Sequence, residues 1–541
     1  MKRWHGNQWA ILLTLSLGFF MTLLDLTIVN IAIPSMIDKL NASLDQVLWV
    51  MNAYILILAV LLITCGRLGD LRGPRTLFIA GVAVFTIASL LCGISQNPAE
   101  LIGARVIQGL GAALLLPQTM TLIISTFPAD RRGAAMGIWG AVAGVATIAG
   151  PTIGGLLVTA LDWRWIFFVN LPVGVLVLFM AVAIIPDIRP GRRHKLDLGG
   201  VTIATASLFC LVFGLTEGQR YEWNVGIWSL IGAGVVLLVV FVLHQRSRQD
   251  NEPLVPFALF RDRNFTVMNF VAAAVSVGMI GIFLPMTIYL QSVLGYSALK
   301  AGLVMAPASL VSMFLAPVAG RLSDKIGGKY ILIGGLTLYG LGTAWIIAIA
   351  DVGTDWTAFL PPFILTGIGI GGVFAPMATV AMRNVEPRMA GAASGFMNTI
   401  RQVGSVIGSA SVGAVMQSQL ASALKDEAAK RSASLPASYR PQFVEGFQHA
   451  AKGGLEVGAG QTGIAQHLPA NVPSGVAAQL QQLAGQVFSH GFVHAMKPTM
   501  GLPVLVVLIG AAACLGITRR PANGGASTPG ASETAEAALP G

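Results

Sequence analysis

The chain has 541 residues, of which 55% are hydrophobic and only 11% are charged, and its formal net charge is +10. Soluble globular proteins carry roughly 25% charged residues, so this composition excludes a fold with water on all sides and indicates a membrane protein. The lysines and arginines lie in short segments between apolar runs, not on one face or tail, which argues against nucleic-acid binding. The four cysteines lie far apart inside apolar runs and are interpreted as small core residues.

Fourteen apolar stretches are long enough to span a bilayer, which requires about 20 residues per helix. In chain order they cover residues 10–33, 48–66, 76–95, 101–126, 134–158, 165–185, 198–216, 226–244, 266–290, 300–320, 330–350, 357–380, 389–415 and 497–517. The first stretch is longer than the apolar core of a cleavable signal peptide and carries Asp25, so we expect it to remain as a helix. The expected fold class is an all-α polytopic membrane protein.

The lysines and arginines of the short connections predict the orientation of these helices. Twenty-two of them fall on the side of the N-terminus, and four fall on the other side: Lys39, Arg164, Arg220 and Lys300. Because positively charged loops stay inside, both termini are expected in the cytoplasm, with an even number of crossings. If one helix had been missed, the basic connections after it would fall on the opposite side and the charge difference between the two sides would disappear.

The expected domain organisation follows from these spans. Residues 1–190 form a first six-helix bundle, 191–250 hold two extra helices with their cytoplasmic loops, and 251–520 form a second six-helix bundle. Within the second bundle, 417–496 is one long external segment, in which 417–431 and 476–494 have helical patterns. Residues 521–541 are of low complexity and are expected to be a disordered cytoplasmic tail.

A repeated sequence pattern relates the two bundles. Residues 66–75 read GRLGDLRGPR and residues 320–329 read GRLSDKIGGK, so both have Gly-Arg-Leu-small-Asp followed by basic residues around a glycine. Each copy joins the second and third helices of a six-helix bundle when the two extra helices are set aside. We therefore expect a duplicated bundle whose halves rock about a site near the membrane midplane. The alternative is two ordinary cytoplasmic turns.

The first copy resembles the loop motif of the major facilitator superfamily, although Leu71 and Pro74 replace two of its usual residues. Residues 101–113, which include Arg105 and Gln108, resemble the fourth-helix motif of the same family. The segments 24–34 (LDLTIVNIAIP) and 163–172 (WRWIFFVNLP) resemble signatures of its fourteen-helix drug:proton antiporter branch.

Residues 150–155 (GPTIGG) resemble the fifth-helix antiporter motif, with Ala146 where a further glycine is usual. The residues that match are Gly150, Pro151, Gly154 and Gly155. The whole likeness covers residues 10–415. It implies two six-helix bundles with two linker helices between them, and a proton-coupled antiporter in which Arg105 takes part in proton transfer.

Asp25 is the only carboxylate well inside any expected span. An ionised carboxylate there is costly unless it is paired or solvated, so Asp25 is expected to bind and release the coupling proton. Helix geometry places Arg105 at a similar depth, roughly 9–14 Å below the outer surface, and we expect the two to pair. Two alternatives stay open: a permanently paired structural Asp25, and an Arg105 that fastens its helix to the neighbours. Gln108 and Asn30 are further candidates for a structural or substrate-cavity role.

Charged residues of the repeated loops are expected to form a cytoplasmic gate through salt bridges and helix-end contacts. The gate residues are Gly66, Asp70, Arg72, Gly73, Arg75, Asp324 and Lys325. In the fifth helix, the pairs Gly140/Gly144 and Gly150/Gly154 predict a close-packed seam between the two halves, which Pro151 allows to bend. Ordinary helix packing would need the same residues. Arg401 lies mid-helix without an acid at its depth, and a structural role is favoured over substrate contact.

These features favour export of lipophilic compounds, including drugs, in exchange for protons across a bacterial plasma (inner) membrane. The alternatives are a dedicated exporter of one endogenous metabolite and a membrane enzyme or receptor. No Walker-type loop is present, so an ion gradient is the expected energy source. The expected partners are a small-molecule substrate, protons and the bilayer, without a cofactor, metal or nucleic acid. The need for a periplasmic adaptor is left open. A single carboxylate favours neutral or monovalent compounds over divalent cations.

Overall fold

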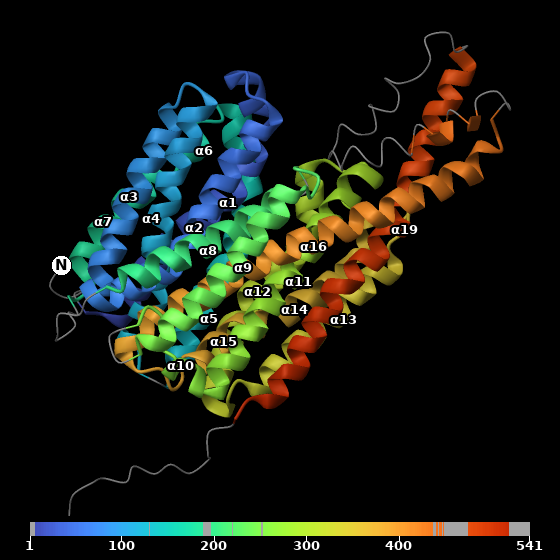
Figure 1. Cartoon of the computed structure of the whole chain (residues 1–541). Helices are drawn as coiled ribbons and strands as arrows, with labels where there is room; N and C mark the ends of the chain where they lie inside the picture. The colour runs from blue at the N-terminus through green and yellow to red at the C-terminus, as the bar shows by residue number, and fades with distance from the viewer. Residues whose placement is uncertain are drawn as a thin grey trace, which may run out of the picture.

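The computed structural model describes residues 6–128, 130–187, 196–218, 220–249, 253–435, 440, 441, 443–445, 447 and 474–518. The first bundle consists of α1 (Gln8–Leu40), α2 (Leu44–Arg72), α3 (Pro74–Ile94), α4 (Pro98–Thr126), α5 (Arg132–Ala160), α6 (Trp165–Phe168) and α7 (Asn170–Ile184). Two further helices follow, α8 (Leu198–Glu217) and α9 (Val225–Ser247). Their residues are drawn from blue to green in Figure 1.

The second bundle is drawn from green to red in Figure 1. It consists of α10 (Ala258–Arg261), α11 (Arg263–Ile288) with the π turn η1 (Tyr289–Val293), α12 (Ala298–Ile326), α13 (Lys329–Ile349), η2 (Trp356–Phe359), α14 (Leu360–Gly371), α15 (Phe374–Ala381), η3 (Pro387–Met389), α16 (Ala390–Ser432), α19 (Ser474–Ala513) and η4 (Cys514–Gly516). The all-α fold predicted from the sequence is confirmed for the described part of the chain.

Polar and glycine residues set the ends of these helices. The Asn7 side chain accepts hydrogen bonds from the backbone N–H groups of Trp9 and Ala10, and so caps the first turn of α1. Gly73 adopts a φ of 95°, a conformation that favours glycine, and Pro74 begins α3 directly after it. The chain therefore turns sharply between α2 and α3, at the first copy of the repeated loop.

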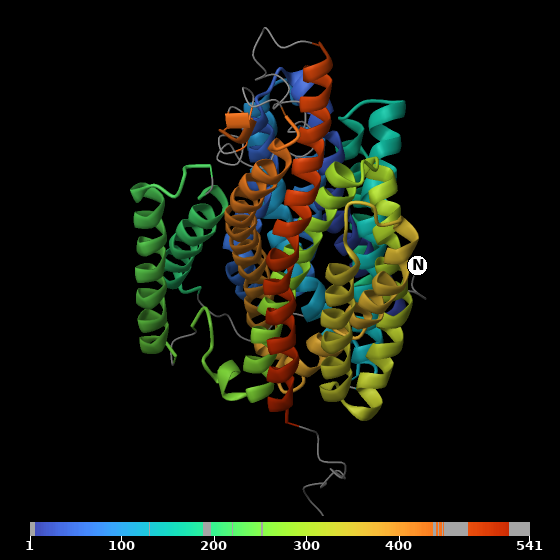
Figure 2. The same cartoon turned by 90° about the vertical axis from the view of Figure 1, so that its right-hand side faces the viewer.

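The two bundles meet along a small number of helices. Within the first, α4 packs on α2 and α3 while α5 packs on α1; within the second, α11, α16 and α19 pack on one another. Between the bundles, α5 packs on α12, and α2 packs on α16. Figure 2 shows α8 and α9 as a separate green hairpin at the side. This hairpin contacts α2 of the first bundle and α16 of the second through α8.

Twelve helical segments in the described part of the chain are long and apolar enough to cross a membrane. α5 and α16 are not among them, although they have 29 and 43 residues and pack between the others. The sequence predicts a span in each of these two helices. The number of crossings, fourteen, therefore stays a prediction.

α16 runs unbroken from Ala390 to Ser432, whereas the sequence places the end of this span at residue 415. No glycine or proline lies between Gly413 and Ser432, so nothing stops the helix at the membrane edge. α19 likewise begins at Ser474, well before the span expected at 497–517. The two helical patterns expected in the external segment are thus helical in the structure, and each of them continues one of the spans. Residues 448–473 and the expected tail 521–541 lie outside the described residues.

Side-chain contacts hold the outer parts of α16 and α19 together. Arg431 donates to Gln486 of α19 at 2.8 Å, and Gly491 of α19 lies against Leu424. Burial raises the pKa of Glu427, but the hydrogen bonds from Lys430 and Arg431 outweigh it and lower this pKa overall. The two helices form one paired extension of the second bundle (Figure 1).

Both described ends of the chain lie at the same end of the molecule. Gln8 at the start of α1 donates to Thr126, which precedes α5, and the first turn of α5 donates to Asp324. Near Asp324, Lys329 donates to the carbonyl oxygens of Leu515 and Ile517. We call this end the basic end, because the charge pattern predicts it to face the cytoplasm, and the other the opposite end. The two chain ends lie on one side, as an even number of crossings requires.

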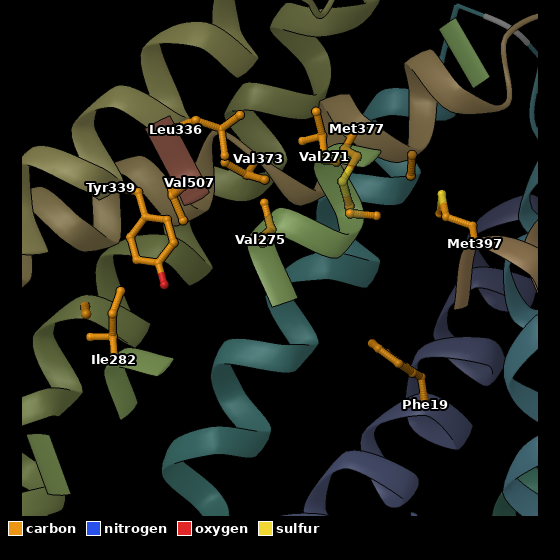
Figure 3. Close-up of a cluster of buried hydrophobic side chains, with 14 of the residues drawn as sticks. Phe19, Val271, Val275, Ile282, Leu336, Tyr339, Val373, Met377, Met397 and Val507 are labelled. Atoms are coloured by element: carbon orange, nitrogen blue, oxygen red, sulfur yellow. The ribbon is translucent and has the colours of Figure 1, made fainter. Parts of the chain in front are cut away.

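The apolar core is continuous between the two bundles. Phe19 of α1 stacks on Trp139 of α5, with ring centroids 4.1 Å apart, and both belong to a buried cluster that includes Met397 of α16. Figure 3 shows Phe19 together with Met377 and Met397 from the second bundle. The two bundles therefore share one buried apolar cluster.

Candidate functional site

Asp25 of α1 lies at the centre of a polar cluster inside the first bundle. Its Oδ2 accepts a hydrogen bond from Arg105 of α4, and its Oδ1 accepts from Gln108 at 2.9 Å and from Asn170 of α7 at 3.3 Å. The side chains of Asp25 and Arg105 are 0% and 1% exposed. So deeply buried an ion pair is stable only where further hydrogen bonds satisfy it, and the two amides supply them.

Arg105 is also fixed by α2. Its Nε donates to Val50 O at 2.9 Å, its Nη1 donates to Gln108 Oε1 at 2.6 Å, and its Cζ lies 4.3 Å from the centre of the Tyr54 ring. A cation over an aromatic face in a dry site is favourable. Arg105 thus makes both kinds of contact that were expected. It pairs with Asp25, and it fastens its own helix to α2.

Three members of this cluster are not singled out by the sequence: Asn170, Ser89 and Tyr54. Ser89 accepts from Gln108 at 2.9 Å and from Asn170 at 3.5 Å. The Tyr54 hydroxyl is buried without a hydrogen-bond partner in the described structure. Asn170 lies within residues 163–172, so the likeness to the family was a usable signal for it, whereas Ser89 and Tyr54 lie in apolar runs without a distinctive spacing.

Asn30 lies outside the cluster. Its side chain is exposed, and its Nδ2 donates to Leu26 O within the same helix at 3.0 Å. The site expected from Asp25, Arg105 and Gln108 is therefore brought together by the fold, but Asn30 does not join it.

The glycines of the antiporter motif pack α5 against α1, within the first bundle. A Cβ at Gly154 would lie 2.8 Å from Ile28, and Gly150 lies against Thr27. Gly155 has open space where a Cβ would be. Pro151 lies within α5. The expectation that Gly150 and Gly154 line the seam between the two halves is therefore wrong.

The earlier glycines of α5 face the second bundle instead. A Cβ at Gly144 would lie 3.0 Å from Ser309 O, and a Cβ at Gly140 would lie 3.7 Å from Phe374 Cβ. At 100° per residue, the step from Gly144 to Gly150 turns the helix well away from its first face. The same helix thus makes the seam with one glycine pair and joins α1 with the other.

Asp70 and Asp324 bind the first turns of helices in the opposite bundle. Asp70 of α2 accepts at 2.7 Å from two successive backbone N–H groups at the start of α16, the first being that of Gly391. Asp324 of α12 accepts at 2.8 and 3.0 Å from two successive N–H groups at the start of α5, the first being that of Gly133. Neither α5 nor α16 has a cap from its own N-cap side chain. The first turn of each helix is therefore capped by a carboxylate from the other bundle.

Glycines allow this close approach. A Cβ at Gly66 would lie 2.8 Å from the Cα atom of Gly395, and a Cβ at Gly320 would lie 3.3 Å from the Cα atom of Gly137. The two contacts are equivalent in the duplicated bundles, since Gly66 and Gly320 begin the two repeated loops. At the basic end the two bundles are therefore held together by backbone contacts and carboxylate caps.

The other expected gate residues make fewer contacts across the gate. Arg75 donates to Val182 O within the first bundle at 2.8 Å, and Arg72 and Lys325 are exposed. Arg67, which was not expected in the gate, has its Nη1 3.9 Å from Asp70 Oδ2. Capping of helix ends thus contributes more to this gate than the expected salt bridges do.

Arg401 of α16 is partly exposed near the middle of the molecule. Its Cζ lies 5.1 Å from the centre of the Phe374 ring, at the start of α15. In the part of the chain that the structure describes, no carboxylate pairs with the guanidinium and no protein acceptor takes its N–H groups. The structural partner that the sequence led us to favour is therefore missing among these residues.

Polar contacts attach the α8–α9 hairpin to α2 at one end and join its two helices at the other. Glu217 at the end of α8 is 3% exposed and accepts from Asn52 of α2 at 3.0 Å, a contact that the sequence does not reveal. At the basic end, Asp197 accepts from the N–H of Gly200 and from the side chain of His244. Burial raises the pKa of Asp197, but these hydrogen bonds outweigh it and hold the pKa below its usual value.

Comparisons with known proteins agree with this architecture. A family model described as the Major Facilitator Superfamily matches residues 15–409. An uncharacterized transporter from Mycobacterium tuberculosis is 42% identical over 415 residues, which are 77% of this chain and 71% of the relative. A tetracenomycin C resistance and export protein from Streptomyces glaucescens is 35% identical over 84% of each chain. The multidrug resistance protein Stp of Mycobacterium tuberculosis is 34% identical over 78% of each.

A solved structure shows the same fold at low identity. The human organic anion transporter MFSD10 has a TM-score of 0.58 and 11% sequence identity, covering 93% of this chain and 99% of its own. The family match covers most of the chain, and it includes both copies of the repeated loop and the helices that they join. Because the match covers most of the chain, this chain belongs to the major facilitator superfamily of membrane transporters.

Proposed function

We propose that the protein exports lipophilic small molecules in exchange for protons, by alternating access between its two bundles. The observation that carries this proposal is the buried Asp25, whose oxygens accept from Arg105, Gln108 and Asn170. When Asp25 binds a proton, it loses the charge that holds Arg105 and one of its acceptor positions. The cluster must then rearrange, and this links the proton to the packing of α1, α4 and α7.

The closed basic end supports alternating access. Opening it requires the separation of four N–H···carboxylate hydrogen bonds and the glycine contacts beside them. Duplicated bundles that rock about a central site work in this way. The relatives named as drug or antibiotic exporters support the outward direction of transport. We place the protein in the bacterial plasma membrane, with both termini in the cytoplasm.

Dedicated export of one endogenous metabolite is the second candidate. It is favoured by a relative that is named for a single compound, tetracenomycin C. A survival screen of cells that express the protein, against a chemically mixed panel of toxic compounds, separates the two: protection against many unrelated compounds supports broad export, and protection against one supports the dedicated exporter.

The variant Asp25→Asn tests the proton role. It keeps the shape of the side chain but cannot titrate, so we expect it to bind substrate and to lose uphill export completely. The measurement uses purified protein in liposomes with an imposed pH gradient and a pH dye in the lumen, which reports proton release when substrate is added.

The matched control is Asp38→Asn, the same change in the same helix at an exposed position. It should transport as the unmodified protein does. Gradient-driven export that persists in Asp25→Asn at the level of this control would assign proton coupling to another group.

A further inference from the structure

One face of α16 near the middle of the molecule is polar and partly exposed. Asn398, Arg401 and Ser405 follow one another at intervals of three and four residues, and so lie on one side of the helix. The other side carries Phe396 and Val403, which pack with α8 and α2 in an apolar cluster. Because the apolar side faces those helices, the polar side faces away from them, and Arg401 on it lies beside Phe374 of α15.

Arg401 lies one helical turn from a buried residue of the apolar cluster that the two bundles share. Met397, four residues nearer the basic end, is 0% exposed and belongs to the buried cluster with Phe19 and Trp139. Arg401 and Phe374 are both partly exposed, and Phe374 also lies against Gly140 of the first bundle. The pair is therefore placed where the two bundles meet.

The backbone around Phe374 is interrupted. α14 ends at Gly371 and α15 begins at Phe374, although both belong to one expected span. Broken helices inside a membrane are tolerated where they are covered by protein or line a cavity, and transporters often build substrate sites from them.

The guanidinium of Arg401 has no counter-charge among the described residues. Asp25 is closed inside the first bundle with both oxygens occupied, and the oxygens of Asp70 and Asp324 accept from helix ends at the gate. One planar face of Arg401 lies near an aromatic ring, and its N–H groups remain available. A charged side chain inside a membrane is stable only when an acceptor pairs with it. Because no described residue accepts from Arg401, a bound molecule would have to supply that acceptor.

We infer that Arg401 and Phe374 recognise the substrate, and that they select flat aromatic compounds with one anionic group, such as a carboxylate. The guanidinium offers two parallel N–H donors to the anion, and the Phe374 ring offers a surface for the aromatic part. This inference rests on the proposed export function, because it names the class of compound exported. It differs from the sequence-based expectation that neutral or monovalent compounds are preferred over divalent cations, because that expectation takes Asp25 as the counter-charge.

A pair of fluorescent probes tests this selection: 7-methoxycoumarin-3-carboxylate, a monoanion, and its neutral 3-carboxamide. Their binding to purified protein in lipid nanodiscs is measured by fluorescence anisotropy, without a pH gradient. We expect the carboxylate to bind at least about 10-fold more tightly than the carboxamide. Equal or weaker binding of the carboxylate would overturn the inference, and this comparison needs no variant.

Variants of Arg401 assign the preference to this residue. Arg401→Gln should weaken carboxylate binding roughly 10- to 100-fold and change carboxamide binding by less than about 3-fold. Arg401→Lys keeps the charge and should retain part of the preference. The control Arg131→Gln removes one exposed charge at the basic end and should change neither affinity. An equal loss for both probes in Arg401→Gln would make Arg401 a structural residue.

Binding and transport are read separately, so that the proposed function and this inference fail in different ways. Asp25→Asn should bind the carboxylate as the unmodified protein does while losing gradient-driven export of it. Export that survives in this variant, with the binding preference intact, contradicts the proton role of Asp25 and leaves the selectivity of Arg401 supported.

Discussion

At the scale of single residues, the cluster around Asp25 shows how a carboxylate is kept in a membrane protein. Arg105 supplies the opposite charge, and the amides of Gln108 and Asn170 supply further donors. Gln108 contacts three members of the cluster without carrying a charge, because it also contacts Arg105 and Ser89. Replacing Gln108 should therefore affect proton binding at Asp25 while both charges of the Asp25–Arg105 pair remain.

Gln108→Met removes the 2.9 Å hydrogen bond to Asp25 while it keeps the volume of the side chain. A hydrogen bond to a charged group contributes about 1.5–3 kcal/mol. Because the ionised form loses this stabilisation, the pH profile of proton-driven export should differ from that of the unmodified protein. Export is measured in liposomes over a series of external pH values.

The control is Gln118→Met, the same change in the same helix. Gln118 is buried and donates to Cys65 O, away from Asp25. It should lower stability without moving the pH profile. A profile in Gln108→Met that coincides with that of the control would show that Gln108 does not stabilise the ionised carboxylate.

The sequence predicts part of this cluster and misses the rest for a physical reason. Equal depth in two helices is enough to pair Asp25 with Arg105, because depth follows from residue number along a helix. Ser89 and Tyr54 are missed because membership also depends on how each helix is rotated about its axis. In a membrane protein both sides of a helix are apolar, so the rotation is not visible in the sequence.

At the scale of helices, the repeated loops act through reciprocal capping. α2 caps α16 and α12 caps α5, so each bundle supplies one carboxylate and receives another. The sequence predicts that Asp70 and Asp324 lie at the gate, but not which helix ends they bind. The glycines of α5 show the same limit, since their spacing predicts close packing but not the partner helix.

Asp70→Ala should weaken the closed state of the gate. The loss of a charged cap costs about 1–3 kcal/mol, so the open population at the basic end should rise roughly 5- to 150-fold. The reporter is Ser394→Cys in a background without the four native cysteines. Ser394 is 0% exposed and bonds Pro117 O across the bundles at 2.9 Å, so a maleimide reaches it only when the gate opens.

Asp130→Ala is the matched control for this measurement. The side chain of Asp130 is 76% exposed. Asp130 precedes α5 and does not cap a helix of the other bundle. The labelling rate of Ser394→Cys should rise in Asp70→Ala and stay constant in Asp130→Ala. An unchanged rate in Asp70→Ala would show that the glycine contacts alone hold the gate.

At the scale of the whole molecule, α16 and α19 are longer than a membrane is thick. With 43 and 40 residues they extend about 60 Å each, twice the hydrocarbon thickness of about 30 Å. The hydropathy pattern predicts where a chain leaves the bilayer, whereas the end of a helix depends on caps and breakers. This is why the span expected to end at residue 415 is part of a helix that continues to Ser432.

Single cysteines test the orientation of the molecule. Arg72→Cys and Lys325→Cys, at exposed positions of the basic end, should react with a membrane-impermeant maleimide only from the cytoplasm. Gln481→Cys, on the outer part of α19, should react only from outside. Labelling of Arg72→Cys or Lys325→Cys from outside would overturn both the number of crossings and the direction of the bundle.

The continuity of α16 has a mechanical consequence. Its first turn is held by Asp70 at the gate, and its last turn, about 65 Å away, lies in the paired extension with α19. A helix of this length acts as a lever arm: one degree of tilt about the gate moves Ser432 by about 1 Å. A binding protein that clamped the tip of this lever would hold the gate shut from the far side of the membrane, without entering the substrate path.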